Sequence, residues 1–156
     1  MQEFCEKVFE KVVYNFVERD KDLTIDLAKA DSYLAKSYDD YRAEHVARWE
    51  EIWKHSDVEI DGDDENQQGI RFCIFNMHQT YHGDDGRLNV GAKGLTGEKY
   101  SGWTFWDSET YCLPFYMFNN PKAAKNLLMY RYNTLPQAKE RSIEQDCKGA
   151  CYPMVT

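Results

Sequence analysis

Three aromatic residues and an acidic residue lie within five positions of the sequence. Trp103, Phe105 and Trp106 come just before Asp107. Aromatic faces pack well against the C–H faces of a sugar ring, and a carboxylate accepts hydrogen bonds from its hydroxyls. The same residues could instead form a hydrophobic staple, with Asp107 capping the helix that follows. The sequence leaves these two interpretations open.

A glycine-rich segment leads into this aromatic cluster. Loops of this length in compact domains are usually functional, and glycine permits close backbone approach to a ligand. Its central part is not a Walker motif, because Lys93 is not followed by Ser or Thr. Lys93 held on this loop could still contact a sugar or a phosphate. The glycines concerned are Gly83, Gly86, Gly91, Gly94, Gly97 and Gly102.

Other polar clusters favour structural roles over a metal site. His78 and His82 have a spacing that can bind a metal, but Gln79 stands where a zinc protease motif needs Glu. The acidic run 61–66 lacks the glycine of a calcium loop and is followed by Phe72 where that loop needs Glu. We expect hydrogen-bonded histidines, a solvated acidic turn, no metal and no cofactor.

Composition excludes several classes of partner. The net charge of −8 makes nucleic acid a poor partner. No apolar run approaches the ~20 residues that span a bilayer, so no membrane partner is expected, and the N-terminus is unlike a signal peptide. Five irregularly spaced cysteines argue against a disulfide framework and favour reduced thiols in a cytoplasm.

Hydrophobic periodicity predicts a mainly α chain. Asn120-Pro121 and Thr134-Leu135-Pro136 each combine a cap with proline in the first helical turn. Pro114 should kink the helix that contains it. The expected elements are helices over 2–19, a broken pair over 24–53, a short strand around 58–60, and helices over 65–81, 106–118, 121–132 and 134–145.

Several motifs occur in the order found in a known enzyme family. They lie at residues 67–72, 87–100, 105–109, 113–116, 126–133 and 149–153. Through them, the chain resembles glycoside hydrolase family 65 between about residue 45 and residue 156. The resemblance implies part of an (α/α)6 barrel over residues 56–156, preceded by a helical linker over residues 1–55.

The resemblance also implies residue roles. Trp106 and Asp107 match the pair that holds the glucosyl unit, and Lys93 and Glu98 are candidates for the rim of the site. Trp103 stands where relatives often have His or a small residue, so its ring could reshape the sugar site. These five residues are the expected substrate-binding set.

No catalytic residue is expected within the chain itself. The general acid of the family is a glutamate expected a few residues beyond the position of Thr156, so the isolated chain should be inactive. The implied reaction is inverting phosphorolysis of an α-linked disaccharide or oligosaccharide, with inorganic phosphate as co-substrate and β-glucose 1-phosphate as product. Which linkage is cleaved stays open.

Two alternatives remain beside the phosphorylase. One is a trehalase-like hydrolase of the same family, which would need a second carboxylate as base. The other is a non-catalytic helical binding module. We expect the isolated chain to form a homo-oligomer, because Phe115, Leu127 and Leu128 would lie on helix faces that lack neighbours.

Overall fold

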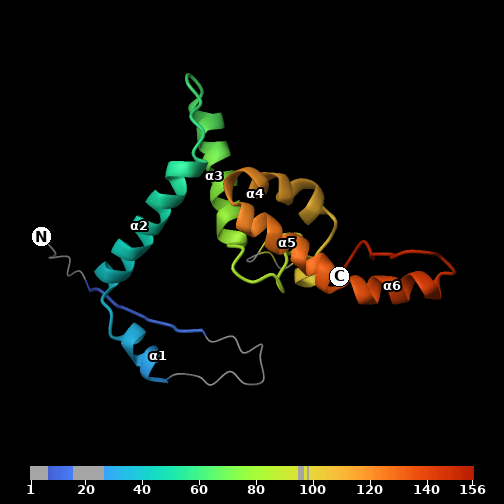
Figure 1. The fold of residues 1–156 in the computed structure, drawn as a ribbon. Helices are drawn as coiled ribbons and strands as arrows, with labels where there is room; N and C mark the ends of the chain where they lie inside the picture. Colours follow the sequence, from blue (N-terminus) through green and yellow to red (C-terminus); the bar gives the residue numbers. More distant parts are fainter. Residues whose placement is uncertain (1–6, 16–26, 95–96, 98) are drawn as a thin grey trace, which may run out of the picture. The chain divides into compact units, whose positions relative to one another are not determined.

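The computed structural model describes residues 7–15, 27–94, 97 and 99–156, and this part of the chain is mostly helical (Figure 1). The mainly α fold class is confirmed. The one β feature among these residues is an isolated antiparallel bridge between Phe105 and Val155. The helical elements are α1 (Leu27–Leu34), α2 (Tyr38–Ser56), α3 (Asp64–Thr80), η1 (Lys99–Gly102), η2 (Ser108–Cys112), α4 (Leu113–Asn119), α5 (Pro121–Asn133) and α6 (Leu135–Glu144).

The chain divides into two compact units, residues 1–52 and 53–156. In the first unit, the expected break between two helices lies between α1 and α2. Ser37 and Asp40 form a reciprocal cap there: the Asp40 amide donates to Ser37 Oγ at 3.2 Å, and the Ser37 amide donates to Asp40 Oδ2 at 3.1 Å. This capping box fixes the start of α2.

The helix predicted over residues 2–19 is wrong for residues 7–15, which contain no helix. Val8 and Phe9 are 80% and 89% exposed. A short amphipathic helix is stabilised mainly by burying its apolar face, and β-branched residues such as Val12 and Val13 lower its intrinsic stability. The other residues of that prediction lie outside the described part of the chain.

The strand predicted around Val58 and Ile60 is also wrong. The Gln67 side chain accepts a hydrogen bond from the Ile60 amide at 2.6 Å and donates to the Val58 carbonyl at 2.8 Å. One side chain on α3 therefore satisfies the backbone groups that a neighbouring strand would otherwise pair. The helix predicted over 65–81 is confirmed as α3, with Asp63 as its N-cap.

The core of the second unit lies between α3, the following loop and the α4–α5 pair. Tyr116 is fully buried and donates its hydroxyl hydrogen to the Met77 carbonyl at 2.7 Å, which joins α4 to α3. The cluster comprises Tyr81, Val90, Tyr116, Ala123, Ala124 and Leu127. The expectation that Phe115 and Leu127 lack neighbours is wrong, because Leu127 is fully buried and Phe115 packs against the cluster. Leu128 is 51% exposed.

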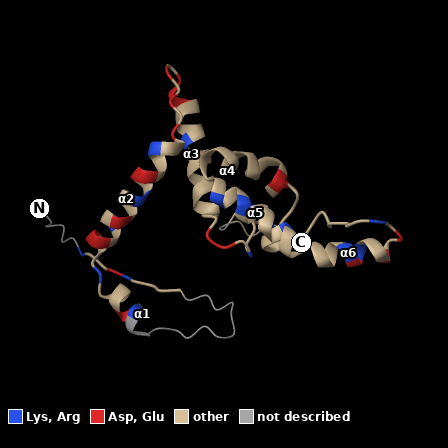
Figure 2. Cartoon of the chain, in the orientation of Figure 1, with Lys and Arg blue, Asp and Glu red and all other residues tan. Residues whose placement is uncertain are grey.

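The helix predicted over 106–118 begins as one π-helical turn and continues as α4. Pro114 lies in the first turn of α4, where its missing N–H costs no helical hydrogen bond. Figure 2 shows that α4 carries no charged residue and that all charged residues of α5 are basic.

Gly83 allows the loop after α3 to touch the start of α5. Its φ is +72°, and a Cβ at this position would lie 2.3 Å from Ala123 Cα. The Asn126 side chain donates to the Gly83 carbonyl at 2.6 Å. The glycine-rich loop is therefore fixed to α5 at its beginning.

Candidate functional site

Asp107 immediately precedes η2 but does not cap it. Its backbone is already in the right-handed helical region, and its side chain accepts no capping hydrogen bond. The carboxylate is exposed and forms no hydrogen bond or ion pair with the residues that the structure describes. The helix-cap interpretation is therefore wrong, and Asp107 can accept hydrogen bonds from a ligand.

The segment that contains Trp106 pairs with residues 153–156. The Thr104 amide donates to the Thr156 carbonyl at 2.9 Å, and the Thr156 amide donates back at 3.0 Å. Trp106 Nε1 donates to the Pro153 carbonyl at 2.9 Å. The indole is 51% exposed, so this bond fixes its orientation and still leaves part of the ring open to a ligand.

A bidentate ion pair lies beside this pairing. Arg131 on α5 donates from Nε and Nη2 to the Glu109 oxygens at 2.8 and 3.1 Å. Only 12% of the Arg131 side chain and 24% of the Glu109 side chain are exposed. The same guanidinium reaches Thr156 Oγ1 at 3.1 Å and the Phe105 carbonyl at 3.4 Å. Arg131 is not among the predicted site residues, because a lone arginine in a sequence gives no signal of such a role.

A hollow of about 520 Å³ opens between these groups. Trp106 supplies an aromatic wall, and the Glu109–Arg131 pair supplies the charged groups. Of the four expected site residues that the structure describes, only Trp106 lines it. The full lining is Trp106, Glu109, Thr110, Arg131, Ala150, Cys151 and Tyr152.

Lys93 and Trp103 are brought together on two adjacent turns of the glycine-rich loop. The Ala92 amide donates to the Trp103 carbonyl at 3.1 Å, and Lys93 Nζ lies 5.8 Å from the centre of the Tyr100 ring. Lys93 and Trp103 are both exposed, the latter by 59%. Glu98 lies outside the described residues.

The predicted structural role of His78 is confirmed. Its Nε2 is hydrogen-bonded to Ser56 Oγ at 2.8 Å, and its ring meets Phe115 edge to face. Within the described ranges, no group of three or more His, Cys, Asp or Glu residues could hold a metal ion. Nor is any helix of that part long and apolar enough to cross a membrane.

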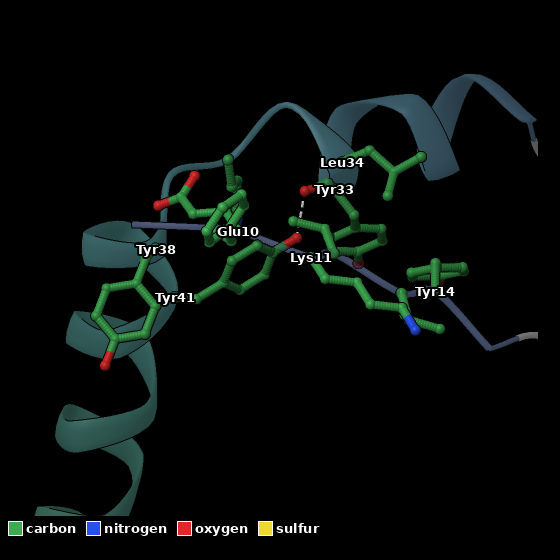
Figure 3. Close-up of a pocket in the computed structure, with 11 residues that line it drawn as sticks. Glu10, Lys11, Tyr14, Tyr33, Leu34, Tyr38 and Tyr41 are labelled. Atoms are coloured by element: carbon green, nitrogen blue, oxygen red, sulfur yellow. Dashed lines mark hydrogen bonds between the residues drawn. The ribbon is translucent and has the colours of Figure 1, made fainter. Parts of the chain in front are cut away.

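A second hollow, of about 640 Å³, lies in the first unit. Figure 3 shows residues from the 7–15 segment facing α1 and the start of α2, with the Tyr41 hydroxyl donating to the Tyr33 carbonyl. Tyr14 stacks on Tyr33 with ring centres 5.2 Å apart. Trp106, Asp107, Lys93 and Trp103, the expected site residues within the described ranges, do not line this hollow.

Comparison with known proteins assigns the second unit. Residues 71–156 match the model of the glycosyl hydrolase family 65 central catalytic domain. The maltose phosphorylase of Bacillus subtilis (strain 168) is 49% identical over 135 residues, which cover 83% of this chain and 18% of that protein. The kojibiose phosphorylase of Halothermothrix orenii is 39% identical over 155 residues, covering 92% of this chain and 20% of that protein.

A solved structure supports the same assignment. A human-microbiome protein that carries the name of a kojibiose phosphorylase superposes with a TM-score of 0.78 at 51% identity, covering 83% of this chain and 18% of the other. This match agrees with part of an (α/α)6 barrel. The chain spans about a fifth of the length of the relatives it matches. It belongs to glycosyl hydrolase family 65, and residues 71–156 are part of the central catalytic domain of that family.

Proposed function

We propose that this chain forms part of the glucosyl-binding wall of a family 65 disaccharide phosphorylase. The enzyme would cleave an α-glucoside with inorganic phosphate, invert the anomeric carbon and release β-glucose 1-phosphate. The proposal is supported by relatives that are named phosphorylases of maltose and of kojibiose. Because those two sugars differ in linkage, the linkage is left to experiment.

The exposed carboxylate of Asp107 carries the proposal. Two carboxylates lie near Trp106, but they differ in availability. Glu109 is engaged by the Arg131 fork, whereas Asp107 forms no bond with the described groups. Asp107 would therefore bind and orient glucosyl hydroxyls, and the half-exposed Trp106 ring would pack against the sugar.

The reaction needs one general acid and no catalytic base. Phosphate is itself an anionic nucleophile, whereas an inverting hydrolase needs a second carboxylate to activate water. The acid would be a glutamate that follows the position of Thr156 in the complete enzyme. Lys93 and Glu98 would lie at the rim, and Trp103 would shape the sugar site. No cofactor takes part.

Product analysis tests this proposal. The complete enzyme that contains this chain would be incubated with a panel of α-linked glucobioses, with and without phosphate. Phosphate-dependent β-glucose 1-phosphate is the expected result. Free glucose formed without phosphate would indicate a hydrolase, and no turnover of any sugar would favour a binding module. The isolated chain is the control and should be inactive.

Asp107→Asn tests the proposed sugar contact in the same complete enzyme. A lost hydrogen bond to a charged group costs about 1.5–3 kcal/mol, so kcat/KM should fall by about tenfold or more. Asp64→Asn, an exposed carboxylate in the first turn of α3, is the matched control. The sugar-contact role is refuted if Asp107→Asn keeps kcat/KM within about threefold.

We further propose that residues 1–55 form a helical linker and residues 56–156 the N-terminal portion of the barrel. The division of the chain into compact units near residue 52 supports this assignment. We also place the protein in a cytoplasm, which fits the free thiols of Cys73, Cys112, Cys147 and Cys151.

Self-association of the isolated chain is the remaining proposal. Phe118, Ile143 and Tyr132 are 86%, 75% and 67% exposed. Exposed apolar groups of this size promote association. Sedimentation velocity over a wide concentration range should show a homo-oligomer, and a monomer at every concentration would refute it.

A further inference from the structure

The Arg131 guanidinium joins helix α5 to two segments that lie far from it in the sequence, residues 105–109 and Thr156. It donates to Glu109 on η2, to the Phe105 carbonyl beside Trp106, and to Thr156 Oγ1. Its backbone is tied as well, because the Tyr152 hydroxyl donates to the Arg131 carbonyl at 2.8 Å. The two partner segments, 104–106 and 152–156, are the ones that pair beside the hollow.

Only an arginine can make this set of bonds. The planar guanidinium holds five N–H donors at fixed angles. A lysine ammonium is a point charge, so it cannot bind a carboxylate in bidentate fashion and also reach two further acceptors. Glu109 supplies the charge that keeps the guanidinium in place. Asn89 Nδ2 lies 3.5 Å from the Glu109 oxygen that accepts from Arg131 Nε, at the limit of a hydrogen bond.

We infer that Arg131, held by Glu109, is a positioning residue that keeps Trp106–Asp107 in register with the Pro153–Thr156 segment. The inference rests on the proposed function, in which Asp107 holds the glucosyl unit and the general acid follows Thr156. Arg131 then sets the distance between the bound sugar and its proton donor without touching either. An error of about 1 Å in such a distance can cost about a hundredfold in rate.

A second ion pair on the same helix provides the control. Lys122 Nζ lies 3.0 Å from Asp84 Oδ1, and the two side chains are 67% and 77% exposed. Such an exposed pair contributes little to stability. Lys122→Met therefore removes a positive charge from α5 without altering the bonds that Arg131 makes.

Kinetics of the complete enzyme test the inference. Arg131→Lys keeps the charge and removes the fork, so kcat should fall by about ten- to a hundredfold while KM for the disaccharide stays within about threefold. Glu109→Gln should act in the same direction, and Lys122→Met should leave both constants unchanged. If Arg131→Lys lowers only the melting temperature and leaves kcat unchanged below it, Arg131 is merely structural and the inference is wrong.

A second measurement does not depend on activity. In the isolated chain, the bond from the Trp106 indole N–H to the Pro153 carbonyl should protect that hydrogen from exchange. Arg131→Lys should speed that exchange by about tenfold or more, while amides of the Leu127 core keep their protection. Trp106→Phe identifies the indole signal in the NMR spectrum. Unchanged exchange in Arg131→Lys would overturn the inference.

Kinetics and indole exchange together distinguish a failure of the proposed function from a failure of the positioning role of Arg131. If the unaltered complete enzyme shows no phosphorolysis, the proposed function fails, and indole exchange alone decides whether Arg131 holds the two segments together. If the complete enzyme is active but Arg131→Lys changes neither kcat nor indole exchange, the proposed function stands and the positioning role falls.

Discussion

Trp106 donates its indole hydrogen to the carbonyl oxygen of Pro153, a residue 47 positions later, at 2.9 Å. The bond connects the start of η2 to the segment that ends in the Thr104–Thr156 backbone pair. Because the indole is half-exposed, a ligand can use one part of the ring while the nitrogen is held. The orientation of the ring is thus set before any ligand binds.

Trp106→Phe removes that bond and keeps an aromatic ring. The free energy of unfolding of the chain should fall by about 0.5–1.5 kcal/mol, towards the lower end because the site is half-exposed. Urea denaturation measures it. Trp103→Phe is the matched control, because the Trp103 indole is exposed and forms no hydrogen bond with the described residues. Equal effects of the two substitutions would contradict the role of the indole bond.

Leu127 and Leu128 offer a neighbouring pair on α5 with opposite environments. Leu127→Ala removes a fully buried side chain and should destabilise the chain by about 2–5 kcal/mol. Leu128→Ala, at a position 51% exposed, should cost clearly less. Thermal or chemical unfolding decides the order, and a larger loss for Leu128→Ala would mean that the core is assigned to the wrong face of α5.

Tyr81 and Tyr116 meet edge to face in the core, but only one hydroxyl is satisfied. Tyr116 donates to Met77, whereas the buried Tyr81 hydroxyl has no hydrogen-bond partner among the described groups. Tyr116→Phe should therefore destabilise the chain by about 1 kcal/mol, while Tyr81→Phe should be neutral or stabilising. Denaturant unfolding of both variants checks the contrast. A loss for Tyr81→Phe as large as that for Tyr116→Phe would show that the Tyr81 hydroxyl is bonded.

Tyr81 also predicts how the stability of the chain depends on pH in alkali. Burial, aided by Asp85 and Asp84, raises the pKa of Tyr81 to about 12. The neutral form is favoured in the fold, so its contribution is complete below the unfolded pKa of about 10 and is lost as the pH rises through about 12. Tyr81→Phe should remove the part of the alkaline destabilisation, measured by circular dichroism, that falls in this window. Tyr111→Phe, at an exposed site, should leave it in place.

An acid prediction concerns the cap of α3. The pKa of Asp63 is lowered by the hydrogen bond from the Asn66 amide and by that from the Asn66 side chain. A lowered carboxyl pKa contributes stability above the unfolded value of about 3.9, and this is lost as the pH falls through the folded value. Asp63→Ala should lower the melting temperature at neutral pH and flatten its fall in acid. Asp64→Ala is the comparison, because it removes a neighbouring carboxylate that is not the N-cap of α3.

Sequence periodicity located the helices that have a buried face or a clear cap. Asn120 accepts a hydrogen bond from the Ala123 amide at 3.1 Å, as the Asn-Pro pair predicts, and α5 begins there. The segment around Val58 and Ile60 has the alternation of a strand, but its backbone bonds go to the side chain of Gln67. Periodicity carries no information on such a partner.

Only the part of the site formed by residues adjacent in the sequence could be predicted. Trp106 and Asp107 stand out by type and adjacency, and the structure gives Asp107 the exposed carboxylate that this interpretation needs. Arg131 and Glu109 are 22 residues apart, and nothing in one sequence links them. Ion pairs of this kind depend on how η2 and α5 pack, which follows from the core and not from local pattern.

The pairing of Thr104 with Thr156 also bears on how the chain emerges from the ribosome. At synthesis rates of roughly 5–20 residues per second, a residue 52 positions later appears some seconds afterwards. Until then the nascent aromatic segment has neither its backbone partner nor the carbonyl that holds its indole. During translation, these rings therefore stay accessible to chaperones until residues 153–156 have been made.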